Sequence, residues 1–162
     1  MATDTLVTYL NDHLAGSTAA LQLLDRLVEE SDAGDSRKFF STLRAEIAED
    51  RGILEDLIRR IGDQPSTLRA VGGWLAEWFG RLKLKLDDPS GDSLAELEAI
   101  EVLMLGIHGK QALWDALVVV APAVPRWADV NFARLAQRAA DQAARVEARR
   151  LDAVRQLVVA EI

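Results

Sequence analysis

The chain has 162 residues, of which 49% are hydrophobic and 28% charged, a balance typical of a folded globular protein rather than a disordered one. A formal net charge of −7 argues against nucleic acid as a partner. Because the chain contains no cysteine, disulfide frameworks, thiolate zinc sites, iron–sulfur clusters and cysteine nucleophiles are excluded. We expect one domain spanning residues 1–162.

Neither a signal peptide nor a membrane-spanning segment is expected. Residues 1–5 lack the basic start and apolar core of a signal peptide. The longest apolar run, residues 116–124, is far shorter than the roughly 20 residues that a spanning helix needs. We therefore expect a cytoplasmic protein.

Hydrophobic residues spaced three and four apart predict two amphipathic helices in the first part of the chain. The first helix runs from about Asp4 to Glu30 and is followed by a tight turn at residues 31–35. The second helix, with Asp35 or Ser36 as its cap, reaches Ile61, where Gly62 and then Pro65 end it.

Two further long helices are predicted after residue 92. The third opens with Ser93 and Glu96, which are spaced as a capping box, and Pro122 breaks it. Asp129 can cap the fourth, which continues almost to the end of the chain.

These four helices predict an all-α fold. Each has about 25 to 30 residues and is therefore about 40 Å long. The short turns make two antiparallel hairpins, and the connection at 62–92 is long enough to cross the length of the molecule. We expect an antiparallel four-helix bundle with a long crossover that carries a short amphipathic helix.

Four glycines, Gly16, Gly52, Gly106 and Gly109, lie inside the predicted helices. Each costs about 1 kcal/mol relative to alanine, which calls for a physical reason. The expected reason is that they let neighbouring helix backbones approach closely.

Ionisable residues lie beside the predicted buried stripe of every helix, at similar distances from the turns. They are His13 on the first helix, Glu46 and Asp50 on the second, Glu101 and His108 on the third, and Glu147 and Arg150 on the fourth. A buried carboxylate needs a cation, a hydrogen bond or a shifted pKa. A polar cluster near the middle of the bundle is therefore expected.

This arrangement resembles the ferritin-like superfamily, whose di-iron members take a Glu from each of two helices and a Glu-x-x-His pair from each of the other two. The motif in this chain departs from that pattern. The second helix has Glu46-Ile47-Ala48-Glu49 and the fourth has Glu147-Ala148-Arg149-Arg150, with no histidine at the expected place. The segments 8–17 and 80–85 also resemble an uncharacterised bacterial branch of ferritin-like proteins, which implies no particular activity.

Arg150 decides among the interpretations of this cluster, because a guanidinium stays charged and cannot bind a metal. If it points inward, it neutralises Glu147, Glu46 or Glu101 in place of a cation. The favoured interpretation is a non-catalytic protein with a metal-free polar network and no cofactor. The alternative is iron or another divalent metal, held as a single ion by residues from the set Glu46, Asp50, Glu101, His108 and Glu147; a complete di-iron oxidase centre is disfavoured.

The crossover, residues 66–86, carries an amphipathic pattern and a local charge of +3 (Arg69, Arg81, Lys83 and Lys85 against Glu77). The favoured interpretation is that its apolar side packs on the bundle. The alternative is a docking element for another protein or a second copy of the chain, with contact to a membrane surface less favoured. The candidate docking residues are Trp74, Trp78, Phe79, Arg81 and Lys83. No Walker-type loop or Gly-x-Ser-x-Gly elbow is present.

Overall fold

The computed structural model describes residues 2–62, 65 and 93–160, and the described part of the chain contains four long helices and no strand. The helices are α1 (Ala2–Glu30), α2 (Asp35–Arg60), α4 (Ser93–Val120) and α5 (Phe132–Ala160). Two short 3-10 turns, η1 (Ala121–Ala123) and η2 (Pro125–Trp127), join α4 to α5. The all-α prediction with four long helices is confirmed, and the helix bounds differ from the predicted ones by at most a few residues.

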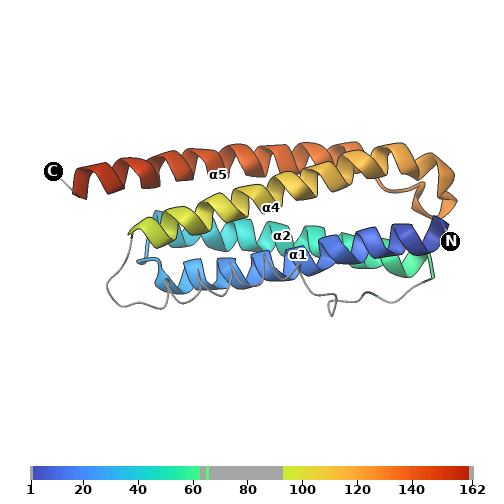
Figure 1. The fold of residues 1–162 in the computed structure, drawn as a ribbon, viewed down its shortest axis with the longest axis horizontal. Helices are drawn as coiled ribbons and strands as arrows, with labels where there is room; N and C mark the ends of the chain where they lie inside the picture. The colour runs from blue at the N-terminus through green and yellow to red at the C-terminus, as the bar shows by residue number, and fades with distance from the viewer. Residues whose placement is uncertain (1, 63–64, 66–92, 161–162) are drawn as a thin grey trace.

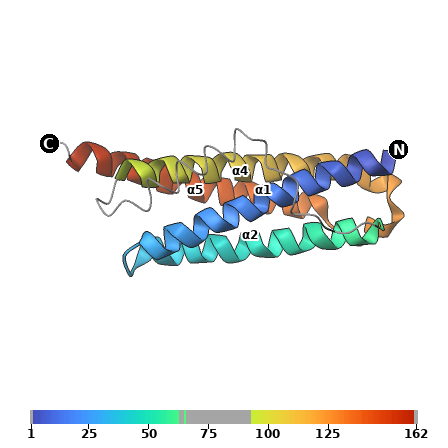
Figure 2. The ribbon, with the colours of Figure 1, turned by 60° about the horizontal axis from the view of Figure 1, so that its bottom comes forward.

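The helices are arranged as two hairpins that lie side by side, α1 with α2 and α4 with α5 (Figures 1 and 2). Close backbone contacts also join α1 to α4 across the two hairpins. The C-terminal end of α2 and the N-terminal end of α4 lie at opposite ends of the molecule (Figure 1). The candidate docking residues Trp74, Trp78, Phe79, Arg81 and Lys83 lie outside the described residues, so their docking role stays a prediction of the sequence.

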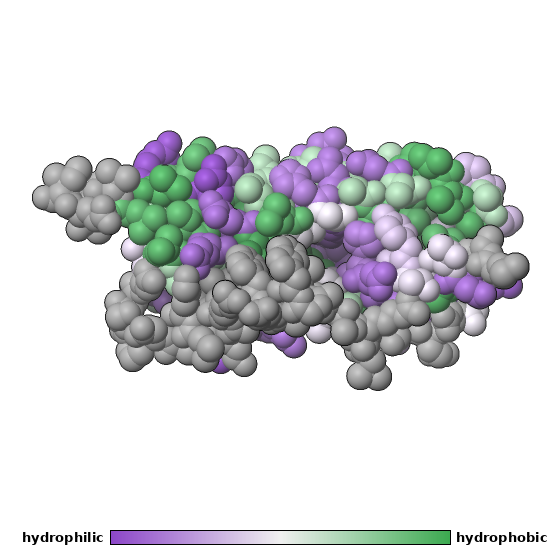
Figure 3. All heavy atoms as spheres, in the orientation of Figure 1, coloured by the Kyte–Doolittle hydropathy of each residue, from purple (hydrophilic) through white to green (hydrophobic). Residues whose placement is uncertain are grey.

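The apolar core is divided into two clusters along the length of the helices. One cluster includes Phe40, Leu43, Ile100 and Leu103, and the other includes Leu10, Leu57, Trp114 and Trp127. On the face shown in Figure 3, hydrophobic side chains likewise gather toward the two ends, with many hydrophilic ones between them.

Polar residues occupy the level between the two clusters on α2, α4 and α5. On α4 this residue is Lys110, which lies between Ile107 of the first cluster and Leu113 of the second. On α2, Asp50 lies between Ile47 of the first cluster and Leu54 of the second, and on α5 Gln142 lies between Ala143 and Ala139. The side chains of Asp50 and Gln142 belong to residues that are only 2% and 0% exposed. Buried polar groups at one level need mutual hydrogen bonds, so this level is where a functional site is to be sought.

The ends of α2 and α5 differ from the predicted caps. Gly34, with a φ of 149°, is the N-cap of α2, and Asp35 is the first residue of the helix rather than its cap. Asn131 caps α5, because its side-chain oxygen accepts a hydrogen bond from the Arg134 amide at 2.9 Å. Asp129, which was predicted as the cap, pairs with Arg60 across the hairpins.

The close approach of neighbouring helices that was expected at Gly16, Gly106 and Gly109 is not found among the described helices. Among the described residues, a Cβ added to Gly16, Gly52, Gly106 or Gly109 would meet no atom within 4 Å outside the immediate chain neighbourhood. Close approach of α1, α2, α4 and α5 therefore does not explain these four glycines.

One segment of the described chain, Ser93–Ala123, is long and apolar enough by itself to cross a membrane, with a mean hydropathy of 1.2 in its best window. Charged residues such as Glu101, Lys110 and Asp115 divide the segment, so it contains no long uninterrupted apolar run. In the structure α4 buries Ile100, Leu103, Trp114 and Leu117. Core helices of helical bundles meet the same criterion of length and hydropathy.

Candidate functional site: a polar layer and a cavity at mid-length

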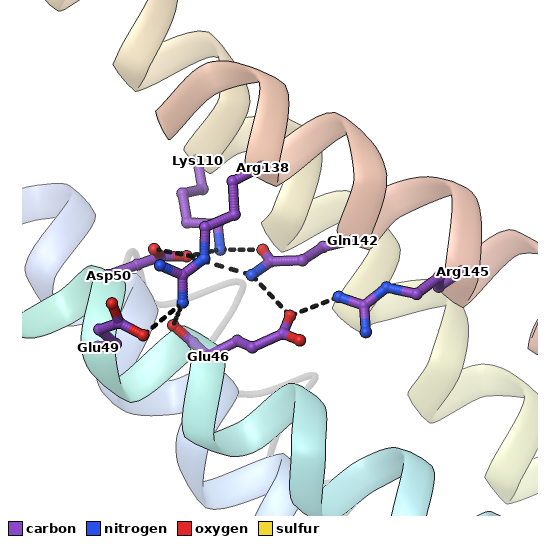
Figure 4. Close-up of polar contacts among 7 residues, drawn as sticks. All are labelled: Glu46, Glu49, Asp50, Lys110, Arg138, Gln142 and Arg145. Carbon is purple, nitrogen blue, oxygen red and sulfur yellow. Dashed lines mark hydrogen bonds and ion pairs between the residues drawn. The ribbon is translucent and has the colours of Figure 1, made fainter. Parts of the chain in front are cut away.

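A polar layer lies between the two apolar clusters and joins α2, α4 and α5 (Figure 4). Its centre is the ammonium group of Lys110, which donates hydrogen bonds to the Asp50 carboxylate and to the side-chain oxygen of Gln142. The Lys110 side chain is 14% exposed and the Asp50 side chain 3%. An ion pair is therefore buried at the middle of the molecule.

Gln142 uses both ends of its amide in this layer. Its oxygen accepts from Lys110, and its Nε2 donates to Glu46 Oε2 at 3.1 Å and to Asp50 Oδ2 at 3.4 Å. The amide thus links the buried lysine to two carboxylates of α2, and a side chain without both a donor and an acceptor could not do so.

Two arginines of α5 complete the layer on its outer side (Figure 4). Arg138 donates to Glu49 at 2.8 Å and its Nε lies 3.5 Å from Asp50 Oδ1, while Arg145 pairs with Glu46. Three cationic side chains (Lys110, Arg138 and Arg145) therefore face three carboxylates (Glu46, Glu49 and Asp50), and the layer is formally neutral.

The electrostatics of the layer follow from burial and these contacts. Burial lowers the pKa of Lys110, against the opposing effect of Asp50. Burial alone would raise the pKa of Glu46, but the hydrogen bonds from Arg145 and Gln142 outweigh it, so this pKa lies below its ordinary value. The hydrogen bond from Arg138 lowers the pKa of Glu49. Both glutamates are therefore held in the ionised form.

The five residues predicted as metal ligands fall into two separate groups. Glu46 and Asp50 belong to the polar layer, whereas Glu101 and His108 lie on the exposed side of α4. Glu147 accepts two hydrogen bonds from Arg150, at 2.7 and 2.8 Å. Across residues 2–62, 65 and 93–160, no three His, Cys, Asp or Glu side chains converge so that they could hold a metal ion. The donor set does not fit the di-iron centre that the ferritin-like resemblance implies.

The cation in the interior is not the one that the sequence analysis singled out. Arg150 pairs with Glu147 and lies 3.5 Å from Glu101, both of which are substantially exposed, and it makes no contact with the polar layer. Lys110 occupies the interior position instead. The signal for it was its spacing, three residues from both Ile107 and Leu113 of the buried stripe. Gln142, three residues beyond buried Ala139, was missed in the same way.

A cavity of about 730 Å³ adjoins the layer between α1, α2 and α4. Its walls are mostly apolar, and Asp50 and Lys110 of the polar layer line it together with His13. The His13 ring packs edge-on against Tyr9, with 4.8 Å between ring centroids, and burial lowers its pKa against the opposing charge of Asp12. His13 therefore borders the cavity as a neutral ring and makes no direct bond to the polar layer.

A second hollow of about 660 Å³ lies between α2 and the start of α5. Charged side chains such as Glu49, Asp56, Arg60 and Arg134 line it, and Gly52 lies on its wall. Its ion pairs join the two hairpins at the surface, for example Arg60 with Asp129.

Comparisons of the chain with protein-family models, with curated proteins and with solved structures found no match. The function is therefore argued from the residues of the polar layer and the cavity.

Proposed function

We propose that this chain is a non-catalytic, ferritin-like four-helix bundle in which a lysine neutralises the acidic centre in place of a metal ion. The observation that supports this proposal is the Lys110 ammonium, which bonds to Asp50 and Gln142 at the level between the two apolar clusters. An ammonium group among these carboxylates supplies the positive charge that a bound cation would otherwise supply.

The ferritin-like arrangement is supported by the order of the helices in space. Two hairpins lie side by side, and α2 ends at the opposite end of the molecule from the start of α4 (Figure 1). A chain that joins these two ends must travel the length of the molecule. One long crossover between two hairpins is the connection found in ferritin-like bundles.

The pairing of the carboxylates supports a non-catalytic role. A general base works best with a pKa near the operating pH, but the pKa values of Glu46 and Glu49 are lowered by their arginine and glutamine partners. Such carboxylates are weak bases. Lys110, for its part, donates hydrogen bonds to Asp50 and Gln142; the bond to Asp50 favours its ammonium form and opposes the burial that lowers its pKa.

Metal analysis tests this proposal directly. We expect native protein, purified without chelators and without nickel affinity media, to contain far less than one equivalent of iron, manganese or zinc per chain by inductively coupled plasma mass spectrometry. One equivalent of metal that is lost in the Glu46→Gln variant would contradict the proposal. Glu55→Gln on the same helix is the matched control, because Glu55 pairs with Arg51 at 2.7 Å and lies outside the polar layer.

A further inference from the structure

Three of the four helical glycines line the cavity between α1, α2 and α4. Gly16 of α1 and both Gly106 and Gly109 of α4 lie in its wall. No described atom lies within 4 Å of a Cβ added at any of the three positions. Glycine in a helix interior is unfavourable relative to alanine, and no contact among the described helices offsets this cost. Close approach by another element of the chain would explain the three glycines.

The connection between the two hairpins has to pass the level of this cavity. α2 ends at Arg60 and α4 begins at Ser93, at opposite ends of the molecule (Figure 1). These ends are about one helix length, about 40 Å, apart. Residues 66–86, which lie outside the described residues, form the middle of this connection. The cavity adjoins the polar layer at mid-length, so the middle of the connection is expected beside it.

Of the two hollows described above, only this cavity suits the amphipathic pattern of residues 66–86. Its walls are mostly apolar and include Leu23 and Val102. The hollow between α2 and α5 is lined by charged side chains such as Glu49 and Asp56 instead. Burial of apolar side chains against apolar walls is favourable, whereas covering charged groups costs their hydration. The apolar side of the segment therefore fits the cavity between α1, α2 and α4.

The charges favour the crossover of the same chain over a second copy as the occupant. Residues 66–86 carry +3, and because the whole chain carries −7, the other residues carry −10. Two complete chains repel each other, whereas the segment is attracted to the acidic remainder of its own chain. Its connections to α2 and α4 also hold the segment near the cavity, which raises its effective concentration there.

We propose that residues 66–86 of the same chain occupy this cavity and lie with their apolar side against its walls. The apolar side consists of Val71, Trp74, Leu75, Trp78, Phe79 and Leu82. Gly16, Gly106 and Gly109 let the segment approach α1 and α4 closely. An amphipathic helix in an apolar groove is a common mode of peptide recognition. Here it joins the α1–α2 hairpin to the α4–α5 hairpin across the face where the cavity lies.

A spin label tests the position of the segment in the full-length protein. The chain has no cysteine and four tryptophans, so one engineered cysteine carries the label and four indole N–H signals report on it. With the label at Asp12→Cys, in the cavity wall, we expect the signals of Trp74 and Trp78 to be lost together with that of Trp114, another lining residue. Ala144→Cys is the matched control, because Ala144 is exposed at the level of the polar layer on α5, which does not line the cavity. With the label there, the signals of Trp74 and Trp78 should remain. Survival of both signals with the label at Asp12→Cys would overturn the proposal.

A mixed sample distinguishes the chain's own segment from that of a second copy. ¹⁵N-labelled chain without a spin label is refolded from urea together with unenriched chain that carries the label at Asp12→Cys. We expect the signals of Trp74 and Trp78 to be unchanged in this mixture. Their loss would assign the cavity to a neighbouring copy and overturn the proposal.

A variant that fills the cavity tests the same contact by proteolysis. Trypsin can cleave residues 66–86 after Arg69, Arg81, Lys83 and Lys85. Gly109→Leu places a side chain in the cavity, so we expect the segment to be released more often and cleaved about tenfold faster or more. Gly52→Leu is the matched control, because Gly52 lines the other hollow, and it should be cleaved at the wild-type rate.

Both leucine variants replace a poor helix former by a good one, so circular dichroism should show that both fold. Cleavage of Gly109→Leu at the wild-type rate would overturn the proposal, and so would equal acceleration in Gly52→Leu. None of these measurements depends on the metal content of the protein, so this proposal and the proposed function fail independently.

Discussion

Replacing Lys110 by methionine removes the only cation that hydrogen-bonds to Asp50 within the described part of the chain. The Asp50 side chain is 3% exposed and would be left with the Gln142 amide as a hydrogen-bond donor and with Arg138 Nε at 3.5 Å. Breaking a buried pair by removing one partner costs about 3–5 kcal/mol. Because Arg138 supplies part of the compensating charge, we expect a loss near the lower end, about 3 kcal/mol in the free energy of unfolding.

The reasoning predicts a strong energetic coupling between the two residues. Asp50→Asn alone should be less destabilising than Lys110→Met, because the Lys110 ammonium keeps its bond to Gln142 and the nearby charge of Glu46. The double variant Lys110→Met with Asp50→Asn leaves neither charge uncompensated, so it should be more stable than the Lys110→Met single variant. Urea unfolding of the four proteins gives the coupling energy, expected to be about 1–3 kcal/mol.

The control for this cycle is Lys38→Met on the exposed surface of α2, which should change stability by less than about 0.5 kcal/mol. A coupling energy between Lys110 and Asp50 that does not exceed about 0.5 kcal/mol would refute the placement of this ion pair in the interior. A double variant as unstable as Lys110→Met would refute it as well.

Two further predictions concern acid stability and helix capping. The pKa of Glu46 is lowered in the folded state, so its contribution to stability is fully present above the ordinary value of 4.5 and is lost as the pH falls from there through the folded-state pKa. Glu46→Gln should therefore reduce the fall in the free energy of unfolding below pH 4.5, measured by urea unfolding. Glu30→Gln, at the exposed last residue of α1, should leave that fall unchanged. Asn131→Ala removes the side-chain acceptor for the Arg134 amide and should cost about 1 kcal/mol, measured in the same way. A loss from Asn131→Ala below about 0.5 kcal/mol would show that the cap is assigned to the wrong residue.

The helices themselves could be predicted from the sequence because each carries its own local signals. The apolar spacing defines the buried stripe of α2, and Gly34 and Gly62, both with positive φ, lie at its two ends where the sequence placed the turns. The short connections also predicted which helices form hairpins. All these signals act within a few residues, so the tertiary structure does not have to be known to read them.

Of the predicted cluster, only Glu46 and Asp50 of α2 belong to the polar layer, and the cation that bonds to Asp50 is Lys110 rather than Arg150. Counting residues from the turns gives the position of a side chain along a helix, whereas its direction around the helix changes by about 100° with each residue. The two turns lie at opposite ends of the molecule (Figure 1), so similar counts from each turn do not place Glu101 and Glu147 at the level of Asp50. Lys110 lies 13 residues before Ala123, whereas Arg150 lies 27 residues after it. Only acidic residues and histidines were considered as candidate ligands in the sequence. Lys110 and Gln142 were therefore overlooked, although their spacing from buried residues is that of the core.

The helical glycines show a different limit of sequence analysis. The sequence establishes that Gly16, Gly106 and Gly109 are unfavourable in a helix, but tight packing and an open cavity account for that cost equally well until the neighbouring atoms are known. The structure argues against tight packing between the described helices, because no described atom lies within 4 Å of a Cβ added at any of the three positions. Lys110 and Asp50 neutralise each other beside this cavity, so the pair adds no net charge to its wall.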